Sequence, residues 1–493
     1  MEQMQESLLT IKELKNAVHG KIVGLAENIK NFSFTSVAID SRQVVPGALF
    51  VPLIGEFQDG HKYIPQAIEK GASVIFVTKS IYEEDERKYM SLASENPKVT
   101  FVVVNNNLHA LQDAARVYVT KFPHLVKIAI TGSSGKTTTK EIMANILRQK
   151  YNLIATVGNF NSETGLPLSV FNIRKEHEAA LFEMGMNREN EIGEIAKVFK
   201  PANAIITNIG TAHIGILGSR DNIAAEKKKI FKYIKRDGFA VIHIKDDYAR
   251  FLAKGVEGKV VYFGADIPEA ESGVKFIEDL GVNGTKFSID GIECILKIPG
   301  SYNYLNALSV IAMAKALGIS AEQIAQGINT LKPPEGRSSV KVAVTKKDSK
   351  GIQKKITVLE DCYNANPDSM ESALEMCAGL QVKGRKIFIL GDMFELGTES
   401  VNAHTRVGAA AVVAKPDLLI FAGRDMENAA NAAKLGGCHN LEYYSDLEED
   451  NLKKLTSGLL NYLKDDDFIF VKASHGMHLE KILEEVIENK EEK

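Results

Sequence analysis

The glycine-rich segment Gly132–Thr137, with the sequence GSSGKT, limits the fold of this chain more than any other feature. An apolar run over Val126–Ile130, typical of a buried strand, precedes it. The stretch from Thr137 to Gln149 follows it and carries apolar residues at helical spacing. A strand that leads through such a turn into a helix predicts a mostly parallel sheet covered by helices, so we expect an α/β fold.

Backbone N–H groups at the start of a helix bind phosphate oxygens, and the helix dipole adds to the attraction. In such loops the lysine adds positive charge at the β- and γ-phosphates, and the hydroxyl that follows it binds Mg²⁺. The usual G-x-x-x-x-G-K-[ST] pattern has glycine where this chain has Ile130, so the loop is a shortened form. A helix-capping turn is the alternative, but the strand before the loop and the helix after it favour phosphate binding. The residues predicted to hold the nucleotide phosphates are Gly132, Ser133, Ser134, Gly135, Lys136, Thr137 and Thr138.

Two polar residues follow further apolar runs of this region. Glu183 comes directly after Ala179–Phe182, and His213 comes a few residues after Ala204–Ile206. Both are expected just beyond the carboxyl ends of parallel strands, where the sites of open α/β sheets form. A carboxylate and an imidazole there can share a metal ion. Spacing alone leaves open a solvated glutamate and a helix-capping histidine.

Alternation of strands and helices divides the chain into three blocks, 1–106, 107–333 and 334–493. The first holds short β-rich runs with a Pro46-Gly47 turn, and the second holds the phosphate loop. Pro333–Gly336 forms a natural linker to the third, whose alternation resembles a dinucleotide-binding sheet. Lys346–Lys355 is predicted to be an exposed hairpin loop.

Composition narrows the class of protein. A formal net charge of −3 gives the whole chain no attraction for nucleic acid or an acidic membrane. No apolar run reaches the ~20 residues that span a bilayer, and the N-terminal segment has no signal-peptide core. The four cysteines lack metal-ligand spacing and fit free thiols in a reducing compartment. We therefore expect a cytoplasmic enzyme.

Several motifs in order along nearly the whole chain resemble the Mur ligase family. The resemblance is carried by Thr131–Glu141, Asn159–Asn161, Thr164–Pro167, Glu183–Gly185, Asn208–His213, Arg337 and Asp361. It implies a small α/β domain for the UDP end of a substrate, a central P-loop ATPase-like domain with a parallel sheet, and a C-terminal Rossmann-like domain. It also implies ATP as cofactor, with two Mg²⁺ ions, and we expect a monomer.

The resemblance assigns roles residue by residue. The catalytic group implied is Lys136, Glu183, His213, Lys227 and Arg337. The metal ligands implied are Thr137, Glu183, His213 and Lys227, the last as the lysine that other family members carbamoylate. Asn303 is expected at adenine, Asp361 at the ribose and Arg337 at the phosphates. The substrate contacts implied are Ser41, Arg42, Asn159, Asn161, Thr164, Tyr363, Asn364, Asn366 and Ser369.

Two segments, Asp361–Met370 and Leu390–Gly397, are similar to the family branch that adds D-alanyl-D-alanine to UDP-N-acetylmuramoyl-tripeptide. The segments Asp40–Arg42 and Asp59–His61 are similar to its N-terminal domain, which holds the UDP end of the substrate. Tyr302 and His475 depart from that branch, which often has histidine and usually arginine there. The third residue of the tripeptide, diaminopimelate or lysine, stays open at this point.

The sequence also leaves other assignments open. A lysine run such as Lys227–Lys229 is usually a solvated helix face, and Asn303 and Asn306 at a helix start usually act as caps. A folylpolyglutamate-synthase-like ligase is the alternative enzyme, and the Asp40–Val51 block argues against it. A catalytically dead muropeptide-binding protein is the alternative from another class, and the intact Lys136 and Glu183 argue against that.

Overall fold

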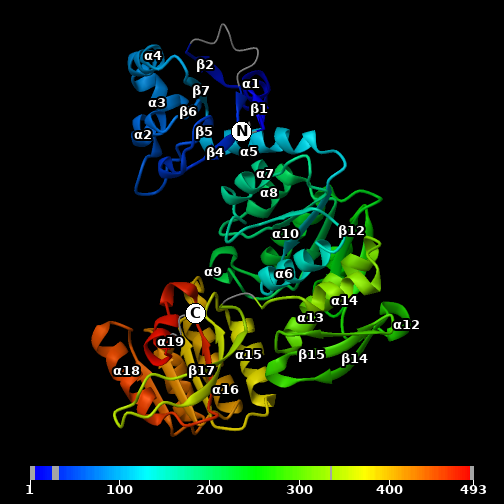
Figure 1. The fold of residues 1–493 in the computed structure, drawn as a ribbon, viewed down its shortest axis with the longest axis vertical. Coiled ribbons are helices and arrows are strands. Elements are labelled where there is room, and N and C mark those ends of the chain that lie inside the picture. Colours follow the sequence, from blue (N-terminus) through cyan, green and yellow to red (C-terminus); the bar gives the residue numbers. More distant parts are fainter. Residues whose placement is uncertain (1–5, 25–32, 334–335, 489–493) are drawn as a thin grey trace.

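The computed structural model describes residues 6–24, 33–333 and 336–488. Three α/β tiers follow one another along the long axis in chain order, from the N-terminal sheet at the top of Figure 1 to the C-terminal sheet at the bottom. The linker residues Pro334 and Glu335 lie outside the described residues.

The first tier is a five-stranded sheet of order β2-β7-β6-β5-β4, in which only β2 runs antiparallel to its neighbour. Strands β6 and β7 are buried along their whole length, and their Val, Ile, Phe and Thr residues suit a sheet covered on both faces. The elements of this tier are β1 (Leu9–Thr10), α1 (Ile11–Val18), β2 (Lys21–Val23), β3 (Ser33–Phe34), β4 (Ser36–Ala38), β5 (Ala48–Phe50), α2 (Ile64–Glu69), β6 (Val74–Thr78), α3 (Lys79–Glu84), α4 (Glu86–Glu95) and β7 (Thr100–Val104).

The second tier is a six-stranded, all-parallel sheet of order β13-β12-β11-β8-β10-β9. Its strands are β8 (Val126–Thr131), β9 (Leu153–Ala155), β10 (Ala179–Glu183), β11 (Asn203–Ile206), β12 (Phe239–His243) and β13 (Lys259–Phe263). Its helices are α5 (Asn107–Tyr118), α6 (Lys136–Leu147), α7 (Gly165–Phe171), α8 (Glu191–Phe199), α9 (Ile214–Leu217), α10 (Arg220–Lys228), α11 (Ala249–Ala253), α12 (Glu269–Ser272), α13 (Ser301–Ala316) and α14 (Ala321–Asn329). An antiparallel sheet of β14 (Val274–Asp279), β15 (Thr285–Ile289) and β16 (Ile292–Leu296) extends it.

The central strand β8 fixes where the functional side chains gather. It lies between β10 and β11, with Ile130 opposite Glu183 and Thr131 opposite Ile206. Because the three strands are parallel, their carboxyl ends open onto the same edge of the sheet. The loops after β8, β10 and β11 therefore meet there.

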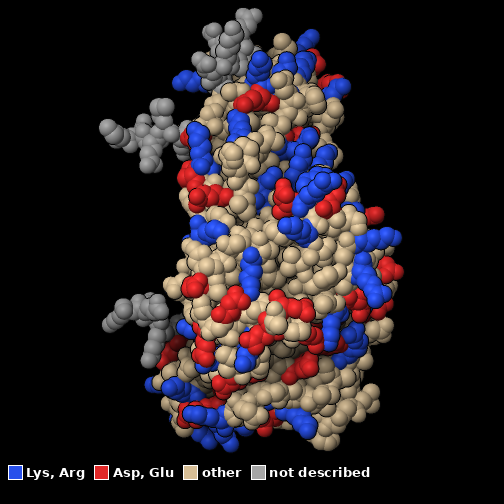
Figure 2. Space-filling view, turned by 90° about the vertical axis from the view of Figure 1, so that its right-hand side faces the viewer, with Lys and Arg blue, Asp and Glu red and all other residues tan. Residues whose placement is uncertain are grey.

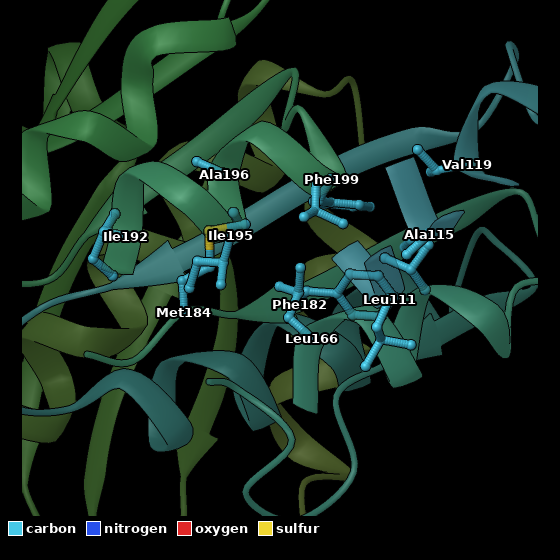
Figure 3. Packing of buried hydrophobic residues seen from close by; sticks show 14 of the residues in the cluster. Leu111, Ala115, Val119, Leu166, Phe182, Met184, Ile192, Ile195, Ala196 and Phe199 are labelled. Carbon is cyan, nitrogen blue, oxygen red and sulfur yellow. The ribbon is translucent and has the colours of Figure 1, made fainter. Parts of the chain in front are cut away.

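Alternate residues of β8 enter two hydrophobic clusters. Ile128 and Ile130 pack with α6, α13 and α14 on one face. Ala129 belongs to the other cluster, which contains α5, α7 and α8 and continues into the first tier. Figure 3 shows part of this second cluster, where Phe182 of β10 lies beside Phe199 of α8 with ring centroids 4.7 Å apart. The first two tiers thus share apolar packing.

The third tier is a six-stranded sheet of order β17-β18-β22-β19-β20-β21, parallel except for β17. Its elements are β17 (Ser339–Val344), β18 (Lys355–Asp361), α15 (Pro367–Gly379), β19 (Lys386–Gly391), α16 (Ser400–Val413), β20 (Leu418–Ala422), α17 (Met426–Leu435), β21 (Leu441–Tyr444), α18 (Glu449–Tyr462), β22 (Phe468–Lys472) and α19 (Glu480–Val486). The stretch Lys346–Lys355 joins β17 to β18, so the predicted hairpin is confirmed.

Lys, Arg, Asp and Glu side chains of both signs are interspersed over the face drawn in Figure 2. Within residues 6–24, 33–333 and 336–488, no helix combines the length and the apolar character that crossing a bilayer requires.

Candidate functional site

The phosphate loop forms the predicted turn between β8 and α6. Gly135 takes φ 75°, a left-handed conformation that glycine adopts without strain. A Cβ at this position would also lie 2.5 Å from Oδ1 of Asn306. No side chain caps α6 at Gly135, so the first N–H groups of the helix are available to an anion.

Asn208 and Thr207, which directly follow β11, hold the loop in shape. The Asn208 side chain accepts from the backbone N of Ser134 at 3.1 Å and donates to the Ser134 carbonyl and hydroxyl oxygens at 3.2 and 3.0 Å. Thr207 donates its hydroxyl to the same carbonyl at 2.6 Å. No site role was predicted for Thr207 or Asn208 individually, although Asn208 belongs to a matched motif.

Lys136 and Lys227 donate to one acceptor, the carbonyl oxygen of Gly132, at 2.9 and 3.0 Å. Burial lowers the pKa of Lys136. Burial, with the nearby Lys136 charge, holds the pKa of Lys227 well below its ordinary value. Lys227 is 1% exposed, so this member of the lysine run is not part of a solvated face.

Glu183 is buried at the end of β10, 3% exposed, which rules out the solvated-glutamate alternative. One carboxylate oxygen accepts from the Thr137 hydroxyl at 2.7 Å, and the other accepts from Nδ2 of Asn161 at 2.8 Å. The side chain therefore ties the phosphate loop to the loop after β9.

His213 precedes α9 at the N-cap position with φ 66°, but its side chain makes no capping hydrogen bond. Its Nδ1 lies 2.9 Å from Oε2 of Glu395, a residue of the third tier. No hydrogen bond joins the two atoms, so the pair is a close polar contact. Burial lowers the pKa of His213, and the contact with His213 lowers the pKa of Glu395.

A cleft of about 910 Å³ opens between the second and third tiers. The cleft brings together most of the predicted site residues of the second and third tiers. Those that line it are Ser133, Ser134, Gly135, Lys136, Thr137, Thr138, Asn159, Asn161, Glu183, His213, Asn303, Arg337, Asp361, Tyr363, Asn364, Asn366 and Ser369.

On the third-tier wall, the guanidinium of Arg337 lies 3.6 Å from the ring centroid of Tyr363, a cation–π contact. Asp361 pairs with Lys472 at 2.5 Å. Lys472, a cleft residue without a predicted role, also donates to the Asn364 carbonyl at 3.1 Å.

Asn303 and Asn306 lie on α13, which begins at Ser301. Neither caps the helix: Nδ2 of Asn303 donates to the Pro299 carbonyl at 2.7 Å, and Nδ2 of Asn306 donates to Asn303 Oδ1 at 3.3 Å. Tyr302 stands where the family branch often has histidine. Its hydroxyl hydrogen bonds that of Ser338 of the third tier at 3.0 Å.

Five predicted residues do not line the cleft. Gly132, the first residue of the loop, and Lys227 are joined by the hydrogen bond described above. Thr164 precedes α7, with its hydroxyl 3.2 Å from that of Ser162. Ser41 and Arg42 belong to the first tier, where Ser41 donates to Gln66 at 2.6 Å and Arg42 pairs with Asp40 at 2.7 Å.

A smaller pocket of about 200 Å³ adjoins the cleft and shares part of its lining. The shared residues are His213, Asn364, Asn366, Glu395 and His475. Ala212, Ala365, Phe394 and Leu396 add apolar surface. His475 stacks on Tyr363, with ring centroids 5.6 Å apart.

The donor set around Glu183 fits Mg²⁺ bound together with a nucleotide. No group of three or more His, Cys, Asp or Glu residues with metal-ligand geometry occurs in the described parts of the chain. Mg²⁺ in nucleotide sites needs no such cage, because it takes one or two protein oxygens, phosphate oxygens and water. The Thr137 hydroxyl and the Glu183 carboxylate, 2.7 Å apart, supply oxygens of that kind.

Comparisons with known proteins identify the family. The model described as "Mur ligase family, catalytic domain" matches residues 33–119, "Mur ligase middle domain" matches 130–314, and "Mur ligase, glutamate ligase domain" matches 344–475. The chain belongs to the Mur ligase family. The resemblance seen in the sequence motifs is thereby confirmed, as is the three-domain α/β fold.

Relatives within the family share nearly the full length. The chain is 38% identical over 476 residues to the UDP-N-acetylmuramoyl-tripeptide--D-alanyl-D-alanine ligase of Treponema pallidum (strain Nichols), which covers 96% of this chain and 98% of that protein. It is similar to MurF from Acinetobacter baumannii with a TM-score of 0.80 and 26% identity, covering 97% of this chain and 98% of that one. It is also similar to MurF ligase from Thermotoga maritima in complex with ADP, with a TM-score of 0.73 and 25% identity, covering 91% and 96% of the two chains.

Proposed function

We propose that this Mur ligase joins D-alanyl-D-alanine to UDP-N-acetylmuramoyl-tripeptide at the expense of ATP, a step in the synthesis of peptidoglycan precursors. Relatives that carry this activity in their names match the whole chain. The observation that carries the proposal is the shared cleft, in which the phosphate loop faces the Tyr363–Ser369 segment of the third tier.

The reaction proceeds in two steps. A carboxylate oxygen of the tripeptide attacks the γ-phosphorus of ATP, and the bond between that phosphorus and the β-phosphate oxygen breaks. The products of this step are ADP and the acyl phosphate of the tripeptide. The amine of D-alanyl-D-alanine then attacks the acyl carbon, and the tetrahedral intermediate loses phosphate and a proton to give the amide. Phosphorylation is needed because a carboxylate oxygen is a poor leaving group.

Such a transfer needs positioning and charge neutralisation more than covalent help from the protein. The N–H groups at the start of α6 and the ammonium of Lys136 would hold the β- and γ-phosphates. Arg337 would add positive charge from the opposite wall. We assign Asn303 to adenine and Asp361 to the ribose, and both line the cleft.

We assign Thr137 and Glu183 to one Mg²⁺ ion, and Glu183 with His213 to a second. When bound, Mg²⁺ neutralises charge on the phosphate oxygens and on the attacking carboxylate. Burial that lowers the pKa of His213 keeps its ring neutral, which is the form that ligates metal.

Lys227 is proposed as a carbamoylated residue. The neutral amine adds to carbon dioxide and releases a proton, so a neutral group becomes an anion able to bind metal. Burial and the nearby Lys136 charge, which lower the pKa of Lys227, favour the neutral amine.

Ser41 and Arg42 are proposed to hold the UDP end, with Asn159, Asn161 and Thr164 along the muropeptide. The dipeptide would enter by the smaller pocket, whose alanine, phenylalanine and leucine side chains suit two methyl groups. We further propose domains over 1–106, 107–333 and 334–493, a monomer, and a cytoplasmic location, which suits four free cysteines.

Phosphate release with ATP, Mg²⁺ and UDP-muramoyl-tripeptide, with and without D-alanyl-D-alanine, tests the proposal. Lysine- and diaminopimelate-containing tripeptides should be run in parallel to identify the third residue. We expect sustained release only when tripeptide and dipeptide are both present. Release that needs neither would identify a plain ATPase instead.

A further inference from the structure

We propose that Asp368 is a positioning residue: it latches the third tier onto the Thr207–His213 loop and so holds the second and third domains in their closed arrangement. Its carboxylate oxygen Oδ2 accepts two hydrogen bonds from Thr211, one from the backbone N at 2.6 Å and one from the hydroxyl at 2.8 Å. Thr211 belongs to the second tier and Asp368 to the third, so these bonds span the cleft that both line.

Asp368 is free for this contact because α15 does not need it as a cap. Asn366 and Ser369 already form a reciprocal capping box at the start of the helix. Asp368 is a first-turn residue, where a negative charge is compatible with the helix dipole. Its carboxylate can therefore bond another segment without removing a cap from α15.

The contact is too close to admit a side chain on the partner loop. A Cβ built on Gly210 would lie 2.3 Å from Oδ2 of Asp368. The backbone N of Gly210 donates to the Ser133 hydroxyl at 2.9 Å, and Ser133 N donates to the Asn208 carbonyl at 3.0 Å. A short path of hydrogen bonds thus joins Asp368 to the phosphate loop.

A second segment of the third tier approaches the same loop from its far end. His213, two residues after Thr211, contacts Glu395 at 2.9 Å. A Cβ on Gly215 would lie 2.8 Å from the backbone N of Gly397. The third tier therefore contacts the carboxyl-terminal part of the loop after β11 at two positions, Thr211 and His213.

A latch of this kind acts on domain closure rather than on nucleotide affinity. The phosphate loop belongs wholly to the second tier, so ADP should still bind there when the latch is lost, with only the contacts assigned to Arg337 and Asp361 of the third tier weakened. Catalysis needs Arg337 of the third tier next to that loop, so turnover depends on the closed arrangement. The kinetic part of this inference rests on the proposed function.

The test compares four full-length variants: Asp368→Ala, Asp368→Asn, Thr211→Val and, as control, Glu375→Ala, an exposed position on the same helix. For Asp368→Ala we expect kcat to fall roughly 10-fold or more, since two hydrogen bonds to a carboxylate are lost. The dissociation constant of ADP, measured by calorimetry, should rise by a smaller factor than kcat falls, because the phosphate loop itself stays intact. The kcat values of Thr211→Val and Asp368→Asn should lie between those of wild type and Asp368→Ala. The kcat of Glu375→Ala should equal that of wild type.

Small-angle scattering without ligands gives a reading independent of the reaction, and Asp368→Ala should have a larger radius of gyration than wild type. Wild-type kcat and an unchanged radius in Asp368→Ala would overturn the latch. ADP binding weakened by as large a factor as kcat, together with a lower Tm, would also overturn it, in favour of a merely structural role. A wild-type protein that makes no amide product would instead refute the proposed function, and the scattering result would still decide the latch.

Discussion

Two ammonium groups, those of Lys136 and Lys227, point at the same carbonyl oxygen of Gly132. Neither lysine makes a salt bridge within the described part of the chain, and burial disfavours the charge on both. A phosphate group entering the cleft offers Lys136 a stronger, charge-assisted partner than a carbonyl. We therefore expect Lys136 to leave Gly132 when nucleotide binds, while Lys227 stays behind the loop.

Replacing Lys136 with alanine should abolish ADP formation, with a fall in kcat on the order of 1000-fold, because charge on the γ-phosphate is no longer neutralised. A coupled ADP assay measures it, and an unchanged Tm shows that the fold persists. Near-normal turnover in this variant would contradict the assignment of the loop.

Asn208 supplies three hydrogen bonds to one residue of the loop, Ser134. Asn208→Ala should raise KM for ATP roughly 10-fold, since the loop loses its brace. Asn208→Asp keeps the acceptor but loses both donors, so its KM should lie between those of wild type and alanine. Equal KM values in all three proteins would show that Thr207 alone holds the loop.

The site residues predicted from the sequence are those whose role can be inferred from their neighbours in the chain, such as Lys136 in its glycine loop and Glu183 after an apolar run. Two cleft residues without a predicted role, Glu395 and Lys472, pair with residues far along the chain, His213 and Asp361. Such pairings depend on how two tiers meet, which no local pattern encodes.

At the scale of elements, an ion pair fixes the two central strands of the third sheet. Asp467, just before β22, accepts from the backbone N of Arg385 at 3.0 Å and from its guanidinium at 3.2 and 2.7 Å. Arg385 precedes β19, the neighbour of β22, and stacks on Tyr462. The Asp467 side chain is almost fully buried, so removing it leaves the Arg385 guanidinium without its anionic partner.

Asp467→Ala should therefore destabilise the third domain by about 3 kcal/mol, as expected when one partner of a buried pair is lost. Urea unfolding followed by circular dichroism measures the change. Asp466→Asn is the matched control, because Asp466 is exposed and asparagine tolerates its φ of 66°. Equal destabilisation by both variants would mean that charge removal alone, not the pair, was responsible.

Strands β8 and β10 were predicted within one residue of their observed bounds, because their sequences are mostly apolar runs of the kind that a covered sheet buries. The sheet β14–β16 was missed. Five of the six residues of β14 are exposed, so its sequence lacks the apolar signal of a core strand. The edge strands β9 and β21 were missed because they are only three and four residues long, too short for a periodic pattern.

At the scale of the molecule, the three tiers are joined in two different ways. The first and second share one hydrophobic cluster, whereas the two clusters of the third contain residues of that tier alone, apart from the partly buried Val282 at the edge of one. The described contacts between the second and third tiers are largely polar. We therefore expect the third domain to move and the first to stay fixed relative to the second.

A non-hydrolysable ATP analogue at 100 times its dissociation constant should stabilise the domains that it touches by about 2.7 kcal/mol. Hydrogen exchange should slow in the second and third sheets and stay unchanged in β6 and β7. Protection confined to the second sheet would show that the third domain does not close on the nucleotide.

The cluster shared by the first two tiers has a practical consequence. Helix α5 packs against α1 on one side and against α7 and α8 on the other. A recombinant fragment lacking residues 1–106 would leave one flank of α5 bare, and its apolar side chains would meet water. Such a fragment should precipitate, whereas a cut after Lys332 should yield two well-behaved products.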